Sequence, residues 1–232
     1  GKSVKKAAAR TEPAALIVFD RVVASNPDFK KYWLLHSIEE PTIGESSFVV
    51  KRTKDGDSGM LHCSVLLPEA DDVNIEKVGG PGKEFWVFGE NYPNAATTRP
   101  DPCNERGEWR VEVTPKTAAE EDSFLTVMQV MDNTVASLPV QRIDGDKVVG
   151  AAVCGRVVMF RRDSGQLSES FSFEVPKSAG KKVKVLLTDL AEGAWTIKRN
   201  GKVFKADVTV TLEEGCIYFD ATPGQYCVEV NM

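Results

Sequence analysis

The sequence predicts an all-β protein, an antiparallel β-sandwich followed by a small C-terminal β domain. Three observations lead to this fold class. Apolar and polar residues alternate with the period of a strand along most of the chain, turn residues separate these segments, and almost no segment has the period of a helix. Many strands with hardly a helix must bury their apolar sides by packing one sheet on another.

The first part of the chain holds the longer predicted strands. The segment 14–23 is rich in β-branched residues and precedes the turn signal Asn26-Pro27-Asp28. A cluster of glycines at 79–82 predicts a hairpin or corner, and 115–121 has room for one helical turn. The predicted strands cover 14–23, 31–38, 47–53, 60–67, 73–78, 84–88, 107–114 and 123–131.

The segment 107–114 alternates most clearly. Trp109, Val111 and Val113 fall on one face and Arg110 and Glu112 on the other, which indicates a sheet with one side facing water.

Shorter strands follow in the second part of the chain. Asn200-Gly201 between two strand-like arms is the strongest short hairpin signal available, and another hairpin is predicted at the C-terminus. We predict a β-sandwich portion over 1–150 and a small β domain over 151–232, with the change between 145 and 180. The predicted strands cover 147–152, 155–160, 169–175, 182–187, 193–199, 208–212, 215–220 and 225–230.

Composition excludes several classes of protein. The formal net charge is −5, so the basic footprint of a nucleic-acid binder is missing and a polyanionic partner would need a local basic groove. No apolar run reaches the roughly 18 residues of a membrane span. The five cysteines are widely spread and predict mostly buried free thiols, although Cys216 and Cys227 could meet across the C-terminal hairpin.

The residues show no catalytic or metal-binding motif. The two histidines, His36 and His62, lie within predicted strands, and no spacing joins them to a carboxylate such as Asp20 in a metal site. We therefore predict no catalytic residue, no metal ligand and no cofactor in this chain.

The proline-rich segment 91–104 has no hydrophobic period and predicts a long loop, a type of segment that often carries binding. Guanidinium groups suit sulfate and carboxylate oxygens, and aromatic rings suit the apolar face of a sugar. The candidate substrate-binding residues are Arg99, Arg106, Arg110, Tyr92 and Trp109.

The alternative for this site is that Arg110 pairs with a neighbouring carboxylate and Trp109 fills the core. The lysines at Lys30–Lys31 and in 51–54 are a second candidate contact with an anionic polymer, or else solubilising residues at a sheet rim.

The sequence also resembles the β-sandwich part of heparinase II/III-type polysaccharide lyases. Matching segments run through nearly the whole chain in order. They are Val18-Phe-Asp-Arg-Val-Val23, 26–38, Asp57-Ser-Gly-Met60, Leu66-Leu-Pro68, 78–89, 105–112, Arg142-Ile-Asp-Gly-Asp-Lys-Val-Val-Gly150 and Leu187-Thr-Asp-Leu190.

This resemblance implies a periplasmic or secreted bacterial enzyme that cleaves acidic, glycosaminoglycan-like polysaccharide by β-elimination. It also implies an N-terminal helical catalytic domain in the same parent chain, with the catalytic Tyr and His residues and the metal ligands before Gly1. The expected role of this chain is then non-catalytic, supporting the catalytic domain and lining the substrate cleft. The rival hypothesis is a carbohydrate-binding or surface-attachment β-sandwich module.

Overall fold

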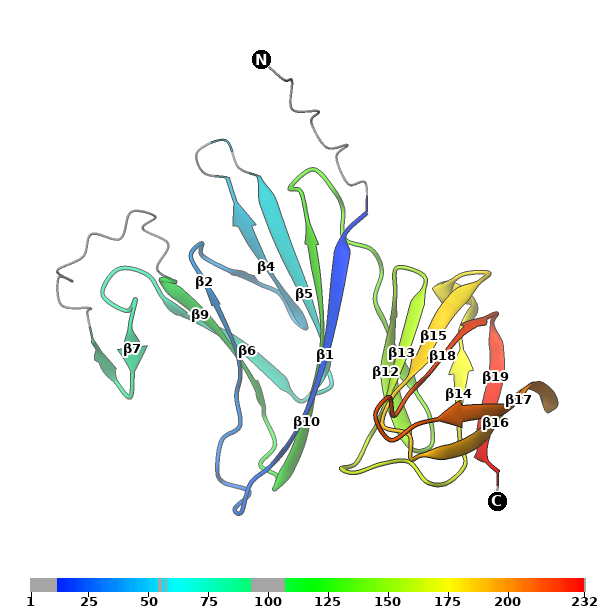
Figure 1. Ribbon diagram of the computed structural model, residues 1–232. Helices are drawn as coiled ribbons and strands as arrows, with labels where there is room; N and C mark the ends of the chain where they lie inside the picture. Colours follow the sequence, from blue (N-terminus) through cyan, green and yellow to red (C-terminus); the bar gives the residue numbers. More distant parts are fainter. Residues whose placement is uncertain (1–11, 54–55, 57, 93–106, 232) are drawn as a thin grey trace. The chain divides into compact units, whose positions relative to one another are not determined.

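The computed structural model describes residues 12–53, 56, 58–92 and 107–231 (Figure 1). The predicted all-β class is confirmed. Within the described residues, the only helical element is the short 3-10 turn η1 (Lys177–Ala179). None of the described helical elements is long and apolar enough to cross a membrane.

The chain divides into two compact units, with the change between Ser137 and Leu138; the short segment Phe19–Arg21 is grouped with the second unit. This division falls before the interval 145–180 in which the sequence places it. The reason is that β11 and β12 pair with each other, and β12 then pairs with β13, so 141–153 belongs to a sheet of the second unit.

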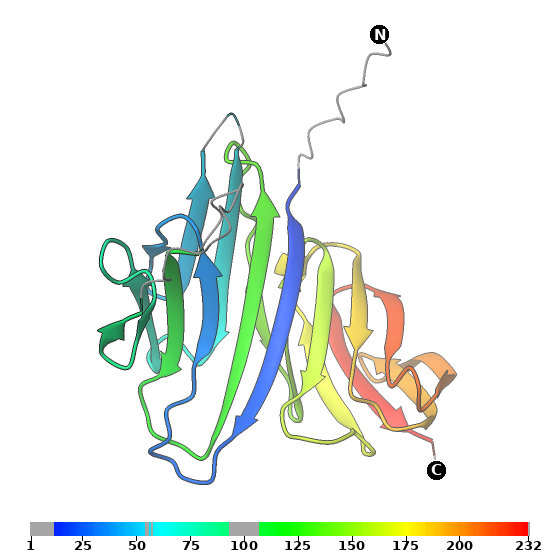
Figure 2. The same ribbon diagram turned by 60° about the vertical axis from the view of Figure 1, so that its left-hand side comes forward.

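Three sheets build the first unit (Figure 2). In Figure 2 the blue strand β1 lies beside the long green strand β10 in the largest of them. The five-stranded sheet has the order β1 (Ala14–Val23), β10 (Glu121–Met131), β5 (Gly59–Leu67), β4 (Ser47–Arg52), β3 (Thr42–Ile43); the three-stranded sheet has the order β2 (Trp33–Ser37), β9 (Trp109–Pro115), β6 (Val73–Gly79); β7 (Trp86–Val87) pairs with β8 (Glu90–Asn91).

The core of the first unit lies between its two larger sheets. Phe48 and Phe124 come from the five-stranded sheet, while Val111 and Val113 come from β9 of the three-stranded sheet. Val111 and Val113 are fully buried, and Arg110 and Glu112 remain partly exposed, so the alternation predicted for this strand is confirmed.

The structure decides two local expectations for the first unit. The segment 115–121 is not helical, because Asp72 takes its backbone donors: the Lys116 N–H donates to the Asp72 carbonyl (2.7 Å) and the Thr117 N–H to the Asp72 carboxylate (2.9 Å). Of the two alternatives for the glycine cluster, a hairpin or a corner, the hairpin is excluded, since β6 pairs with β9 and β7 pairs with β8.

The second unit is a sandwich of two sheets. Its five-stranded sheet has the order β11 (Gln141–Asp144), β12 (Val148–Val153), β13 (Arg156–Arg161), β15 (Val183–Leu187), β18 (Ile217–Ala221), and its four-stranded sheet has the order β14 (Phe171–Val175), β19 (Gly224–Val230), β16 (Gly193–Arg199), β17 (Lys202–Val210). The core between them includes Trp195, Tyr226 and Phe171. One pair, β13 with β15, is parallel.

The Asn-Gly hairpin is confirmed. Asn200 and Gly201 have φ angles of 49° and 76°, and they join β16 to β17. Such left-handed angles at both central residues suit the twist of the flanking strands.

The predicted C-terminal hairpin is wrong. β18 pairs with β15 and β19 pairs with β14 and β16, so the last two strands lie in opposite sheets. Cys216 and Cys227 are accordingly free thiols. Of the four cysteines within the described residues only Cys63 is buried, and burial raises the pKa of its thiol to about 12.

Candidate functional site

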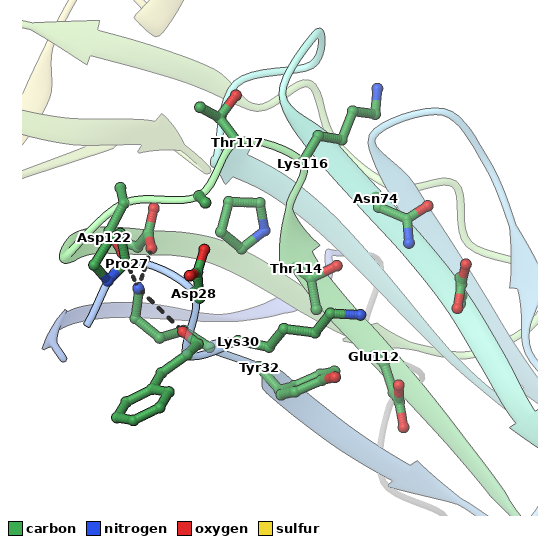
Figure 3. A pocket seen from close by; sticks show the side chains of 16 residues that line it. Pro27, Asp28, Lys30, Tyr32, Asn74, Glu112, Thr114, Lys116, Thr117 and Asp122 are labelled. Atoms are coloured by element: carbon green, nitrogen blue, oxygen red, sulfur yellow. Dashed lines mark hydrogen bonds and ion pairs between the residues drawn. The ribbon is translucent and has the colours of Figure 1, made fainter. Parts of the chain in front are cut away.

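The first unit carries a pocket of about 510 Å³ where the β1–β2 and β9–β10 connections meet (Figure 3). Strands β6 and β9 form its other wall. A volume of this size lies within the range of about 300–1,000 Å³ that is usual for small-molecule sites. The pocket is lined by 27–32, Asn74, Glu76, Glu112, 114–119 and Asp122.

A buried ion pair lies at one side of this pocket. The Lys31 ammonium is 2.9 Å from the Asp122 carboxylate, and the two side chains are only 6% and 11% exposed. Lys31 also donates to the carbonyl of Ala119 and, at 3.5 Å, to that of Phe29. Because Ala119 lies in the β9–β10 connection and Asp122 lies at the start of β10, Lys31 fixes the β1–β2 connection to this part of the chain.

The entrance of the pocket offers groups that could contact a polar ligand. Phe29 and Tyr32 are 57% and 46% exposed, and Lys30 and Lys116 are exposed beside them. Figure 3 shows Lys30 and Tyr32 on the β1–β2 connection and Lys116 on the opposite side. Lys116 is partly oriented by its own hydrogen bond to the Asp71 carbonyl (3.0 Å).

The charges that line this pocket nearly cancel. Lys31 neutralises Asp122, and Arg110, from outside the lining, neutralises Glu112 at 2.6 Å. Two lysines, Lys30 and Lys116, then face two carboxylates, Asp28 and Glu76. A balanced pocket with exposed aromatic rings can bind a sugar through stacking and hydrogen bonds, without a strong preference for anions.

The structure places three of the five sequence-predicted site residues. Arg99 and Arg106 lie outside the described residues. Arg110 forms the ion pair with Glu112 and donates to the Trp86 carbonyl (3.0 Å), so the alternative, in which a neighbouring carboxylate holds it, is the observed arrangement. Among the described residues, Glu112 is the lining residue with which Arg110 pairs.

Trp109 is half-buried against the glycine cluster. A Cβ atom added to Gly80 would lie 2.8 Å from the Trp109 ring, and the Lys77 ammonium lies 5.7 Å from a Trp109 ring centre. These neighbours occupy much of the ring surface that a sugar would need. Tyr92, by contrast, is 55% exposed directly after β8.

The β7–β8 hairpin beside Tyr92 is an exposed, internally braced feature. Its turn residue Phe88 is fully exposed. Glu84 accepts hydrogen bonds from the Gly82 N–H (3.0 Å) and the Asn91 amide (3.2 Å), and backbone hydrogen bonds at Glu84 and Gly82 are the main causes that lower the pKa of the Glu84 carboxyl. The hairpin therefore exposes the Phe88 ring at its turn, while hydrogen bonds to Glu84 fix the residues at its other end.

The two histidines do not come together. His36 is exposed on β2 of the three-stranded sheet, while His62 is on β5 of the five-stranded sheet, where burial lowers its pKa. Over the ranges that the structure describes, no group of three or more His, Cys, Asp and Glu residues is placed to hold a metal ion.

Sequence reasoning missed most of the pocket. Lys30 and Lys31 were candidates either for contact with an anionic polymer or for solubilising a sheet rim, but Lys31 is buried against Asp122 and Lys30 alone of the two faces the solvent. The signal that could have found the pocket is the run of aromatic and basic residues, Phe29 to Tyr32, that follows the Asn26 turn.

Comparison with known proteins places this all-β sandwich more closely. The model of the heparinase II C-terminal domain matches residues 142–230, which extend from β11 to the end of β19. Residues 142–230 of the second unit are thus similar to the heparinase II C-terminal domain, and this match supports the expected resemblance to the C-terminal portion of heparinase II/III-type proteins. No curated protein matches the chain.

Proposed function

We propose that this chain is the non-catalytic C-terminal β region of a polysaccharide lyase that cleaves acidic, glycosaminoglycan-like polymers by β-elimination. The observation that carries the proposal is the heparinase II C-terminal domain over 142–230. The family implies a polysaccharide substrate and a companion catalytic domain in the same parent chain. A periplasmic or secreted location and a bacterial source are part of the same proposal.

The role within the lyase is to support the catalytic domain and to contact the polymer. β-Elimination next to a uronate requires a base for the proton and a group that stabilises the enolate, held in one cleft. The sequence has two histidines, and the structure holds them on different sheets. The first-unit pocket and the predicted loop residues Arg99 and Arg106 supply polymer contacts in this proposal.

The 232-residue chain is expected to show no lyase activity by itself. Incubation with heparin and with heparan sulfate should leave the absorbance of unsaturated uronate products at the level of a blank without protein. A commercial heparin lyase in the same buffer serves as the positive control. A rise above the blank that is lost on heating the chain would contradict the non-catalytic role.

Substitution of Tyr32 by Ala is expected to weaken saccharide binding. Loss of an aromatic contact worth about 0.5–1.5 kcal/mol should raise the Kd for an unsulfated uronate-containing tetrasaccharide by about two- to tenfold. Calorimetric titration of the folded variant provides the measurement.

Tyr92→Ala is the matched control, because Tyr92 is a similarly exposed tyrosine of the same unit that does not line the pocket. An effect of Tyr92→Ala with none of Tyr32→Ala would move the sugar contact from the pocket to the loop at 91–104.

A free-standing carbohydrate-binding or surface-attachment module is the second candidate function. The pocket with its exposed aromatic rings favours it, since such a module needs a sugar site and no catalytic group. The parent reading frame separates the two candidate functions. Several hundred helix-rich residues upstream, with Tyr and His among them, would support the lyase. A native start near Gly1 would support the module.

A further inference from the structure

A second pocket, of about 460 Å³, lies within the second unit, where the start of β13, the start of β15 and the end of β18 meet. Strand β17, from the other sheet, contributes one aromatic wall. The pocket is lined by Gly155, Arg156, Lys182, Val183, Lys184, Phe204, Asp220, Ala221 and Thr222.

The strand register brings the charged residues of this pocket together. Arg156 is the partner of Lys184 in the parallel pair β13–β15, and Lys184 is the partner of Asp220 in the antiparallel pair β15–β18. Val183 and Val185 are buried in the core, so the alternate positions Lys182 and Lys184 point outward. The three neighbouring strands therefore place a row of charges across the outer face.

The balance of charge in this row is positive. Lys184 lies 3.3 Å from the Asp220 carboxylate and 5.3 Å from the Tyr218 ring centre. Arg156 and Lys182 are exposed, and neither has an ion pair with any carboxylate of the described residues. Two positive charges thus remain without a partner, in contrast to the balanced pocket of the first unit.

The remaining walls are aromatic and rigid. Phe204 is 41% exposed, and its ring is held against the buried Phe219 at 6.1 Å between centroids. The hydroxyl of buried Tyr226 donates to the Thr222 carbonyl (2.7 Å) and accepts from the Thr222 N–H (3.1 Å). These bonds fix the backbone that carries the Thr222 hydroxyl at the edge of the pocket.

We propose that this second-unit pocket binds one anionic sugar of an acidic polysaccharide, with its sulfate or carboxylate at Arg156 and Lys182 and its apolar ring face toward Phe204. A guanidinium fork can hold two oxygens of such a group, an ammonium adds a point charge, and an aromatic ring suits the apolar face of a sugar. This inference rests on the proposed function for the class of polymer. It assigns to the heparinase II C-terminal domain a binding role of its own.

The test is a titration of the ¹⁵N-labelled 232-residue chain with a fully sulfated heparin tetrasaccharide, followed at the amides of Gly155, Lys184 and Thr222. We expect saturable shifts at these three amides. The double variant Arg156→Ala/Lys182→Ala should raise the Kd obtained from them by about tenfold or more, because two charge-assisted contacts are removed.

The matched control is Lys202→Ala/Lys205→Ala, which removes the same formal charge from exposed residues of β17 that do not line the pocket. A Kd that rises equally in both double variants, or in neither, would overturn the proposal. Inorganic sulfate at the same concentration should leave the three amides unmoved. Saturation by sulfate with the affinity of the tetrasaccharide would identify a free-anion site and overturn the sugar assignment.

The result also separates this inference from the proposed function. If the tetrasaccharide binds here and the full-length parent does not cleave acidic polysaccharide, the lyase proposal fails and the pocket stands. If the parent is an active lyase and the three amides do not move, the pocket fails and the lyase proposal stands.

Discussion

Trp195→Ala is expected to lower the free energy of unfolding of the second unit by about 3–5 kcal/mol, the usual cost of deleting a large buried aromatic side chain. Trp195 is fully buried on β16, its ring packs edge-on against Phe171 at 6.3 Å, and its indole N–H donates to the Ala191 carbonyl (3.1 Å). The substitution removes the ring from the centre of the core and leaves that carbonyl without its donor.

Hydrogen exchange of amides in β15 and β16 under increasing urea measures this loss within the second unit. Leu212→Ala is the control, because Leu212 is 69% exposed and its truncation should change the free energy of unfolding by no more than about 0.5 kcal/mol. A loss below about 1 kcal/mol for Trp195→Ala would show that the second unit does not depend on this core.

Lys31→Met should have the largest effect in the first unit. It leaves the Asp122 carboxylate buried without its cation, and breaking a buried pair in this way costs about 3–5 kcal/mol. The carbonyls of Phe29 and Ala119 also lose a donor. Urea unfolding followed at the amides of β9 and β10 measures the change.

The double variant Lys31→Met/Asp122→Leu separates two contributions to the free energy of unfolding: the destabilisation by an unpaired buried charge and the stabilisation by the ion pair itself. Replacement of both partners by apolar side chains should recover most of the lost stability, because no charge then remains buried. Equal losses in the single and double variants would mean that Lys31 acts through its carbonyl contacts instead of through Asp122.

Strands were the part of the fold that the sequence predicted best. The segment 14–23 matches β1 to the residue, and the Asn200-Gly201 turn identified its hairpin because left-handed φ angles at both positions need these residue types. These predictions succeeded because alternation and turn chemistry are local properties of the chain.

The errors in the fold concern which strands pair. Residues 217–221 and 224–230 are adjacent in sequence and separated by a turn, as in a hairpin, yet they enter opposite sheets. The pairing is decided by burial: Phe219 on β18 and Tyr226 on β19 both point into the core between the sheets, with ring centroids 5.9 Å apart. A pattern of alternation gives the same signal for both arrangements.

The candidate sites could be predicted only in part. Arg110 and Trp109 were selected for their chemistry. However, the Arg110 guanidinium forms an ion pair with Glu112, and the glycine cluster covers much of the Trp109 ring surface. The row of Arg156, Lys184 and Asp220 could not be predicted from the sequence, because its three residues lie on three different strands that are far apart in the chain. Long-range register, and not residue type, creates that surface.

The place of β19 in its sheet has a consequence for biosynthesis. In chain order this strand follows the other three strands of its sheet, but it is an interior strand, paired with β14 on one side and β16 on the other. Until it emerges, β14 has no neighbour in its sheet and the sheet is reduced to the β16–β17 hairpin. A nascent chain that has been translated only as far as Pro223 therefore lacks the core residues Tyr226 and Val228, and its β14 and β16 strands cannot yet join in one sheet.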